Sequence, residues 1–157
     1  DLVLKNKENK IYMIRIGEDK DVPQGVKLLE EHRKEFDFGQ FEEDNTEYYT
    51  GLFKAIAKDK TSIISQDNNE YNGMIMGLKI PNLLNPHLIQ LHVLITWVHP
   101  NKRGSSVFYR MHKAFEKMIK QNHKEVKEII YYSIPTTNIN FNKLNYKEFQ
   151  SMYKKEI

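Results

Sequence analysis

The stretch Gln90-Leu-His-Val-Leu-Ile-Thr-Trp-Val-His-Pro-Asn-Lys-Arg-Gly-Ser-Ser-Val-Phe-Tyr-Arg-Met-His-Lys-Ala-Phe-Glu-Lys-Met-Ile-Lys-Gln-Asn122 changes its hydrophobic period at a short polar turn. The apolar and β-branched residues before this turn predict a strand from Leu88 to Val98, which must end before Pro100. The small residues of Arg103–Ser106 predict the turn itself. Apolar residues then recur at helical spacing and predict a helix with one buried face, formed by Val107, Met111, Ala114, Phe115, Met118 and Ile119.

A strand that passes through a turn of small residues into a helix is typical of an anion site. The first N–H groups of the helix point at the turn, and the helix dipole is positive there. We therefore expect a phosphate or pyrophosphate beside residues 103–108. The alternative is a turn that binds nothing, as many strand-to-helix turns do.

The rest of the chain alternates strand-like and helix-like segments. Residues 1–10 are expected to form a loose lead-in, and further strands are predicted at 11–16, 61–65, 71–80, 128–134 and 146–153. Helices are predicted after a cap at Asp21, after a cap at Asn45 or Thr46, and in a short form from Thr136 to Leu144. Because the chain has neither an internal repeat nor a linker, we expect residues 1–157 to form a single domain.

Composition excludes several classes of protein. The net charge of +3 is too small to indicate nucleic-acid binding, and no apolar run is long enough for a membrane span. The polar start argues against a signal peptide, and the lack of cysteine fits a reducing compartment, so we predict a cytoplasmic protein. Histidines and acids do not show metal-ligand spacing, and we expect no metal site. Acids gather in 30–47 and basic residues in 102–127, which would suit a cation and an anion respectively or form two solvated faces.

The segment Val98-His-Pro-Asn-Lys-Arg-Gly-Ser-Ser106 resembles the acetyl-CoA signature of the GCN5-related N-acetyltransferase (GNAT) family. The order of predicted elements is also similar to that family. The resemblance implies an α/β (α+β) fold with a mixed, mostly antiparallel twisted sheet of six or seven strands and about four helices. It also implies a divergent member, because Ser106 and Phe108 replace the family's small residues and Phe108 would bring a large side chain to the turn.

The resemblance implies acetyl-CoA as co-substrate, with an amine that attacks its thioester directly. Backbone near Trp97, Val98 and His99 would hold the thioester carbonyl. The pyrophosphate would lie on the turn, at Arg103, Gly104, Ser105, Ser106, Val107 and Phe108. Asn138 and Phe141 match a second family segment, in which Phe141 stands where the family usually has tyrosine and Asn145 where it has glycine.

His92 is the candidate general base. It lies six residues before Val98, and this even spacing predicts that both side chains share one face of the strand. A histidine that only packs in the sheet is the alternative interpretation. Glu35, Glu42 and Glu43 are further candidates for the base. Tyr132, Ser133 and Tyr146 are candidates for the acid that Phe141 cannot supply.

Two functions therefore stay open at the level of sequence. The first is an N-acetyltransferase that acts on a small-molecule or peptide amine, for which a homodimer or an assembly partner is compatible with the sequence. The second is a catalytically weakened or inactive binding or structural module with this fold, which Ser106, Phe108, Phe141 and Asn145 favour. The abundance of lysine and asparagine is compatible with a phage-encoded origin.

Overall fold

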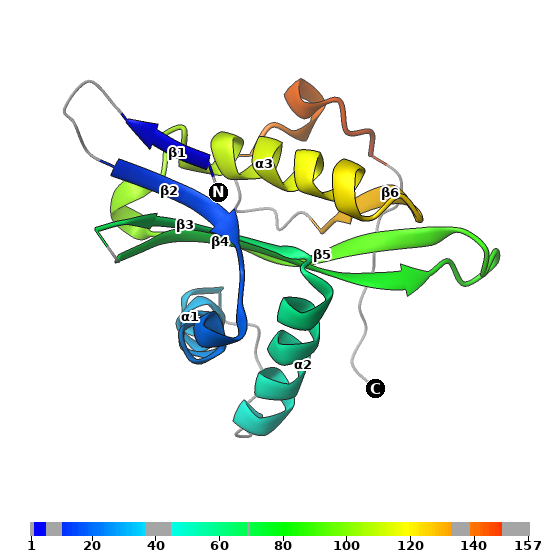
Figure 1. The fold of residues 1–157 in the computed structure, drawn as a ribbon, viewed down its shortest axis with the longest axis horizontal. Coiled ribbons are helices and arrows are strands. Elements are labelled where there is room, and N and C mark those ends of the chain that lie inside the picture. Colours follow the sequence, from blue (N-terminus) through cyan, green and yellow to red (C-terminus); the bar gives the residue numbers. More distant parts are fainter. Residues whose placement is uncertain (1, 6–10, 37–44, 69, 133–138, 149–157) are drawn as a thin grey trace.

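The computed structural model describes residues 2–5, 11–36, 45–68, 70–132 and 139–148. Their strands form one six-stranded sheet in the order β1-β2-β3-β4-β5-β6, so that each strand lies beside its neighbour in the chain. All pairs are antiparallel except β5 and β6, which are parallel. The predicted mixed, mostly antiparallel sheet is therefore confirmed (Figure 1).

The strands agree closely with the sequence prediction, except at the two ends of the chain. Their bounds are β1 (Leu2–Lys5), β2 (Ile11–Ile16), β3 (Ser62–Asp67), β4 (Glu70–Pro81), β5 (Ile89–Val98) and β6 (Val126–Tyr131). The prediction of a loose lead-in is wrong for Leu2–Lys5, because these residues pair with β2. A run of four residues is too short to signal a strand until its partner is known.

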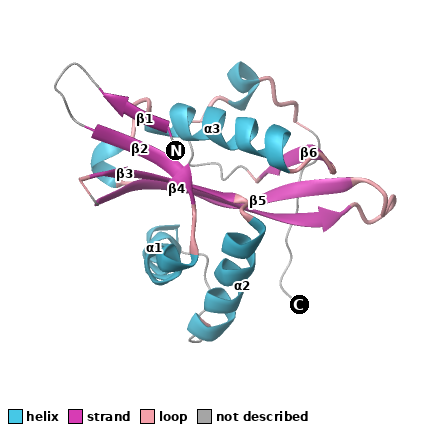
Figure 2. Ribbon diagram, viewed as in Figure 1, coloured by secondary structure: helices cyan, strands magenta, loops and turns pink. Residues whose placement is uncertain are grey.

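In the described part of the chain, three α-helices cover the two faces of the sheet, α3 on one and α1 with α2 on the other (Figures 1 and 2). Their bounds are α1 (Val22–Phe36), α2 (Thr46–Asp59) and α3 (Val107–Asn122). Single 3₁₀ turns form η1 (Asp19–Asp21), η2 (Pro100–Lys102) and η3 (Phe141–Leu144). Within the described ranges, no helix combines the length and apolarity that a membrane span requires.

The end of the chain differs from its prediction. Only η3 stands where a helix from Thr136 to Leu144 was expected, and residues 136–138 lie outside the described part. Residues 146–148 do not form a strand, and the remainder of the expected final strand lies outside the described part.

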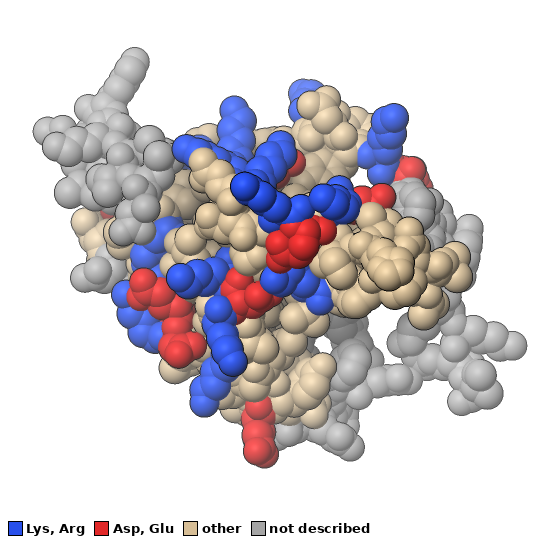
Figure 3. All heavy atoms as spheres, turned by 45° about the vertical axis from the view of Figure 1, so that its right-hand side comes forward, with Lys and Arg blue, Asp and Glu red and all other residues tan. Residues whose placement is uncertain are grey.

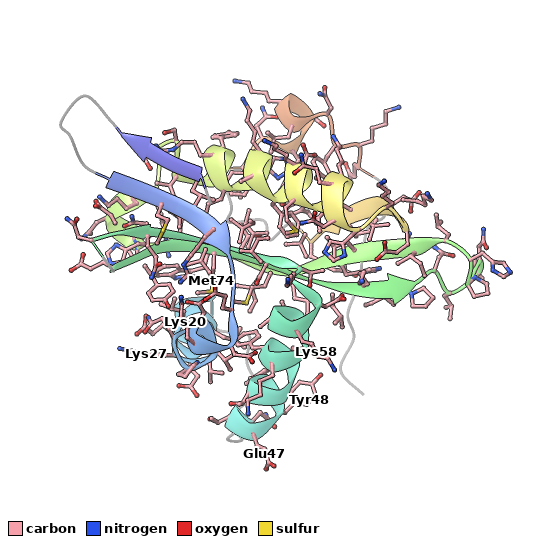
Figure 4. The ribbon with its side chains drawn as sticks, in the orientation of Figure 1. Lys20, Lys27, Glu47, Tyr48, Lys58 and Met74 are labelled. Carbon is pink, nitrogen blue, oxygen red and sulfur yellow. The ribbon has the colours of Figure 1, made fainter. Side chains whose placement is uncertain are left out.

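Each face of the sheet has its own hydrophobic core. The α3 side is filled by the predicted helix face together with residues of the sheet such as Ile14, Ile75, Leu91 and Val93. The other side packs α1 and α2 against Met74, Met76, Ile95 and Trp97. Figure 4 labels Met74 between the sheet and α1. The three central strands β3, β4 and β5 therefore present apolar side chains on both faces.

A buried ion pair joins β2 to the start of α1. The Arg15 guanidinium donates two hydrogen bonds of 2.7 Å to the Asp21 carboxylate. Burial by itself would raise the pKa of Asp21, but hydrogen bonds from Arg15, Tyr71 and the Glu18 N–H outweigh burial and hold that pKa below its usual value. Asp21 therefore acts as an ion-pair partner inside η1, and the prediction that it caps α1 is wrong.

Candidate functional site

Strands β5 and β6 separate part of the way along the sheet. Their parallel pairing runs from Ile89 and Val126 to Val93 and Tyr131 and then stops. Beyond Leu94, which has no partner in β4, the rest of β5 from Ile95 to Val98 pairs with β4 alone among the described strands. Within the described residues, the sheet is therefore open on this side of β5, immediately before the chain enters η2 and α3.

The backbone direction decides which amides face this opening. The His99 N–H donates to the Asn72 carbonyl at 2.9 Å, so this N–H points towards β4. It is therefore not free to hold a thioester carbonyl, contrary to the expectation from the sequence. Positions alternate along an antiparallel pair, so Trp97 also faces β4 while Thr96 and Val98 face the opening. Of the three expected carbonyl-binding positions, Val98 is thus the one whose N–H points to the open side.

The turn between β5 and α3 presents a second group of amides. Every second N–H group from Arg103 to Val107 is already bonded within the protein. The Arg103 N–H donates to the Pro100 carbonyl, the Ser105 N–H to the Lys102 carbonyl, and the Val107 N–H to the Ser105 hydroxyl. Within the described residues, the N–H groups of Gly104, Ser106 and Phe108 donate to no protein acceptor. Gly104 adopts a φ of 77°, a left-handed conformation that glycine tolerates and other residues rarely adopt.

The two unusual side chains of this turn do not block it. Ser106 is exposed and has a φ of −78°, which a non-glycine residue adopts without strain. Phe108 is only 7% exposed and points into the core of the α3 face, where its ring stacks on His112 at 5.8 Å. The expectation that Phe108 would crowd the turn is wrong, because the first turn of α3 directs this side chain inward.

His92 lies on the opposite face of the sheet from Val98. Leu91 and Val93 on either side of His92 pack on the α3 core, so His92 faces the side of α1 and α2. Val98 packs on the α3 core. The prediction of a shared face is wrong because β5 carries an extra residue, Leu94, between the positions that pair with Met76 and Gly77.

Polar partners from β5 and β6 surround His92. Its Nδ1 lies 2.5 Å from the Tyr132 hydroxyl, and its Nε2 lies 3.3 Å from Oε1 of Gln90. Gln90 in turn donates to the Glu128 carboxylate at 2.6 Å. Burial lowers the pKa of His92 below its ordinary value. At neutral pH the imidazole is therefore uncharged and able to accept a proton.

Neither Gln90 nor Glu128 was predicted from the sequence, and Tyr132 was predicted only as a candidate acid. These residues meet because β5 and β6 are parallel with Gln90 opposite Glu128. A polar residue at position 90 of an apolar strand was the available signal. Its partner depends on the register between strands, which no local pattern encodes.

Phe141 and one of the candidate acids, Tyr146, lie in an aromatic cluster on the α3 face. Phe141 packs against Tyr131 at 5.2 Å and Tyr146 at 6.0 Å. Burial, with the nearby Glu116 carboxylate, raises the pKa of Tyr146 well above its usual value, and its hydroxyl is bonded to Glu116. Tyr146 is therefore a poor proton donor. Asn138, Ser133, Glu42 and Glu43 lie outside the described residues, and the side chain of Glu35 on α1 is not described.

The charges of α3 lie on its outer surface. Lys113, Lys117 and Lys120 are exposed, and Figure 3 shows lysine and arginine side chains gathered over the upper part of the molecule, where α3 lies. Arg103 at the start of this region also donates to the Val98 carbonyl at 3.1 Å. Two surface hollows lie elsewhere, one on α2 and one between η1 and α2. Among the described residues, no three side chains converge as metal ligands would.

Comparison with solved structures agrees with this architecture. A predicted acetyltransferase from Clostridium acetobutylicum, solved with acetyl-CoA, superposes with a TM-score of 0.76 at 13% identity over 92% of this chain and 96% of that protein. A GCN5-related N-acetyltransferase from Ralstonia eutropha gives 0.70 at 11% identity, over 92% and 98%. An aminoglycoside acetyltransferase from an uncultured soil sample, in complex with sisomicin, gives 0.67 at 10% identity, over 93% and 96%.

No protein-family model matches the sequence, and no curated protein matches it. The likeness is thus carried by the structure, over nearly the whole length of each protein. At identities of 10–13% it establishes the arrangement of the chain in space. The chain has the fold of the GCN5-related N-acetyltransferases.

Proposed function

We propose that this protein transfers an acetyl group from acetyl-CoA to a primary amine, by direct attack of the amine on the thioester. The observation that carries the proposal is the opening between β5 and β6, which leads directly to the unbonded amides at the start of α3. A neighbour of the same fold was solved with acetyl-CoA. Within the described residues, the edge of β5 that β6 leaves unpaired runs to the backbone donors of the turn, an arrangement that suits a pantetheine arm with a diphosphate.

The turn would hold the diphosphate. The N–H groups of Gly104, Ser106 and Phe108 are unbonded within the described residues, and they lie at the positive end of the α3 dipole. Arg103, Ser105 and Val107 shape the turn through their own hydrogen bonds. The exposed lysines of α3 would add a favourable field for the phosphates. Asn138 and Phe141 stay proposed contacts from the family resemblance.

The open half of β5 would hold the thioester. The Val98 N–H, which points away from β4, is placed to donate to the thioester oxygen as negative charge develops there. Trp97 and His99 would support this position by holding β5 on β4, and the Trp97 ring packs edge-on against His99 at 5.8 Å. These contacts are made by backbone, so they do not require a particular side chain.

His92 would remove the proton from the amine. It lies on the face of α1 and α2, across the sheet from the α3 core, so the amine would approach from that side. The new bond joins nitrogen to the carbonyl carbon, the carbon–sulfur bond breaks, and the second amine proton ends on the sulfur of CoA. Since a thiol has a pKa of roughly 8.5, its thiolate can leave without a tyrosine at position 141.

Release of CoA thiol from acetyl-CoA, measured against a panel of primary amines, tests this function. We expect amine-dependent release by the wild type and a loss of about 10²–10⁴-fold in kcat/KM for His92→Gln. Tyr48→Phe is the matched control, because Tyr48 is 68% exposed and lies on α2 away from the sheet (Figure 4). Binding of acetyl-CoA with no release for any amine would instead favour the binding module.

A further inference from the structure

Both ring nitrogens of His92 are already occupied by protein groups. The hydroxyl of Tyr132, the residue directly after β6, lies 2.5 Å from Nδ1, and Oε1 of Gln90 lies 3.3 Å from Nε2. A substrate amine therefore cannot contact either nitrogen unless it displaces one of these partners. If His92 is the base of the proposed transfer, the proton must reach it through a neighbour.

The network specifies which nitrogen accepts that proton. Glu128 is a carboxylate and can only accept, so the Gln90 NH₂ group must face it, as the 2.6 Å contact requires. The carbonyl oxygen of Gln90 then faces Nε2 of His92, which must carry a hydrogen to donate. A neutral imidazole has one N–H, so Nδ1 is the lone-pair atom and the Tyr132 hydroxyl donates to it.

Tyr132 is the solvent-facing end of this network. Tyr132 is 49% exposed, whereas Gln90, on the other side of the His92 ring, is 6% exposed. The hydroxyl oxygen has a second lone pair, which can accept a hydrogen from an ammonium group in the opening. Tyr132 and His92 project from the same face of the sheet, because Ile130, two residues before Tyr132, pairs with His92.

We propose that Tyr132 is a catalytic residue that relays the amine proton to His92, with Glu128 and Gln90 as positioning residues; this inference rests on the proposed acetyl transfer. The ammonium group gives one proton to the Tyr132 oxygen as the Tyr132 hydroxyl proton moves to Nδ1. Tyr132 ends neutral, His92 becomes an imidazolium ion, and the amine is free to attack. The imidazolium ion, which keeps its Nε2–H bond to Gln90, then releases its proton to solvent.

The first test does not depend on enzymatic activity. Long-range ¹H–¹⁵N NMR of the imidazoles reports the tautomer of each histidine, and the His92→Gln spectrum assigns the signal of His92. We expect a pure Nε2–H tautomer in the wild type and a mixture in Gln90→Leu, because the Tyr132 hydroxyl can either donate or accept. An Nδ1–H tautomer in the wild type would overturn the proposal.

The second test is a double-mutant cycle in the thiol-release assay. We expect Tyr132→Phe to lower kcat/KM by about 10²-fold, with His92→Gln/Tyr132→Phe no slower than His92→Gln alone. Tyr48→Phe should retain wild-type turnover, and thermal melts verify that each variant folds. Wild-type rates in Tyr132→Phe, or losses that multiply in the double variant, would contradict the relay. A wild type with no turnover but the Nε2–H tautomer would refute the transferase function and leave the hydrogen-bond network intact.

Discussion

The side chains of His92 and Val98 lie on opposite faces of one strand, although six positions separate them. The extra residue at Leu94 reverses the alternation between them. One consequence is that β5 offers His92 to the side of α1 and α2, while its far end leads into the turn before α3. The proposed amine and the proposed diphosphate would then approach the opening from different sides.

The close packing of α3 on β4 depends on Gly73. A methyl group at this position would lie 2.6 Å from Cε of Met111 and 2.9 Å from the Trp97 carbonyl oxygen. Since the Trp97 backbone cannot move without disturbing β5, we predict that Gly73→Ala lowers the free energy of unfolding by about 1–3 kcal/mol, as measured in urea.

Gly51 provides the matched control for that substitution. It lies on an exposed side of α2 with open space around it, so Gly51→Ala should stabilise the protein by about 0.5–1 kcal/mol. Equal effects of the two substitutions would show that the contact between Gly73 and β5 does not limit the packing of α3.

His92 should impose a pH dependence on turnover. Among the described residues, the titratable groups that face it are Tyr132, directly after β6, and Glu128 through Gln90, while Leu78 faces it from β4. Because burial lowers the pKa of His92, kcat/KM should fall with decreasing pH only below the ordinary histidine value of about 6.5. His92→Gln should lack this acid limb when profiled with the same amine. Persistence of the limb in the variant would assign it to another group.

The periodic segments of the fold could be predicted from the sequence. The apolar face of α3 was correct because helical spacing over 16 residues is a strong signal. His112 was missed on that helix, since a histidine reads as polar although it is 1% exposed and bonded to Tyr131. The strands predicted at 61–65 and 71–80 were also correct, and they form the antiparallel pair β3 and β4.

The candidate site was less predictable, because it depends on relationships between strands. Leu94 is as apolar as its neighbours, so nothing in the sequence marks it as the bulge. The register of β5 on β6 brings Gln90 to Glu128, and Asp21 meets Arg15 only after η1 folds back on β2. Phe108 was judged by the size of its side chain, whereas the direction of the first turn of α3 decides where that side chain goes.

The ion pair of Arg15 and Asp21 should govern acid stability. Asp21→Asn leaves a buried guanidinium without its counter-ion, and we predict a loss of about 3–5 kcal/mol in the free energy of unfolding at neutral pH. The pKa of Asp21 is lowered in the fold, so its contribution is present above the unfolded value of about 3.9 and disappears as the pH falls through the folded value.

Chemical denaturation of the wild type and Asp21→Asn from pH 7 to pH 2 measures this difference, which should shrink in acid. Lys20→Met is the comparison, because the pair of Lys20 and Glu18 is solvent-exposed and should contribute little. A difference between the wild type and Asp21→Asn that stays constant down to pH 2 would contradict the role assigned to the Asp21 charge.

The most direct test of the central claim is the melting temperature of the wild type with and without acetyl-CoA. Ligand at 100 times its dissociation constant stabilises a protein by about 2.7 kcal/mol, which corresponds to a rise of roughly 5–10 °C for a chain of this size. Ser106→Trp, which places a large side chain at the exposed turn, should melt near the wild type without ligand and lose the rise. A wild type that melts at the same temperature with millimolar acetyl-CoA would contradict the assignment of the opening beside β5 as an acetyl-CoA site.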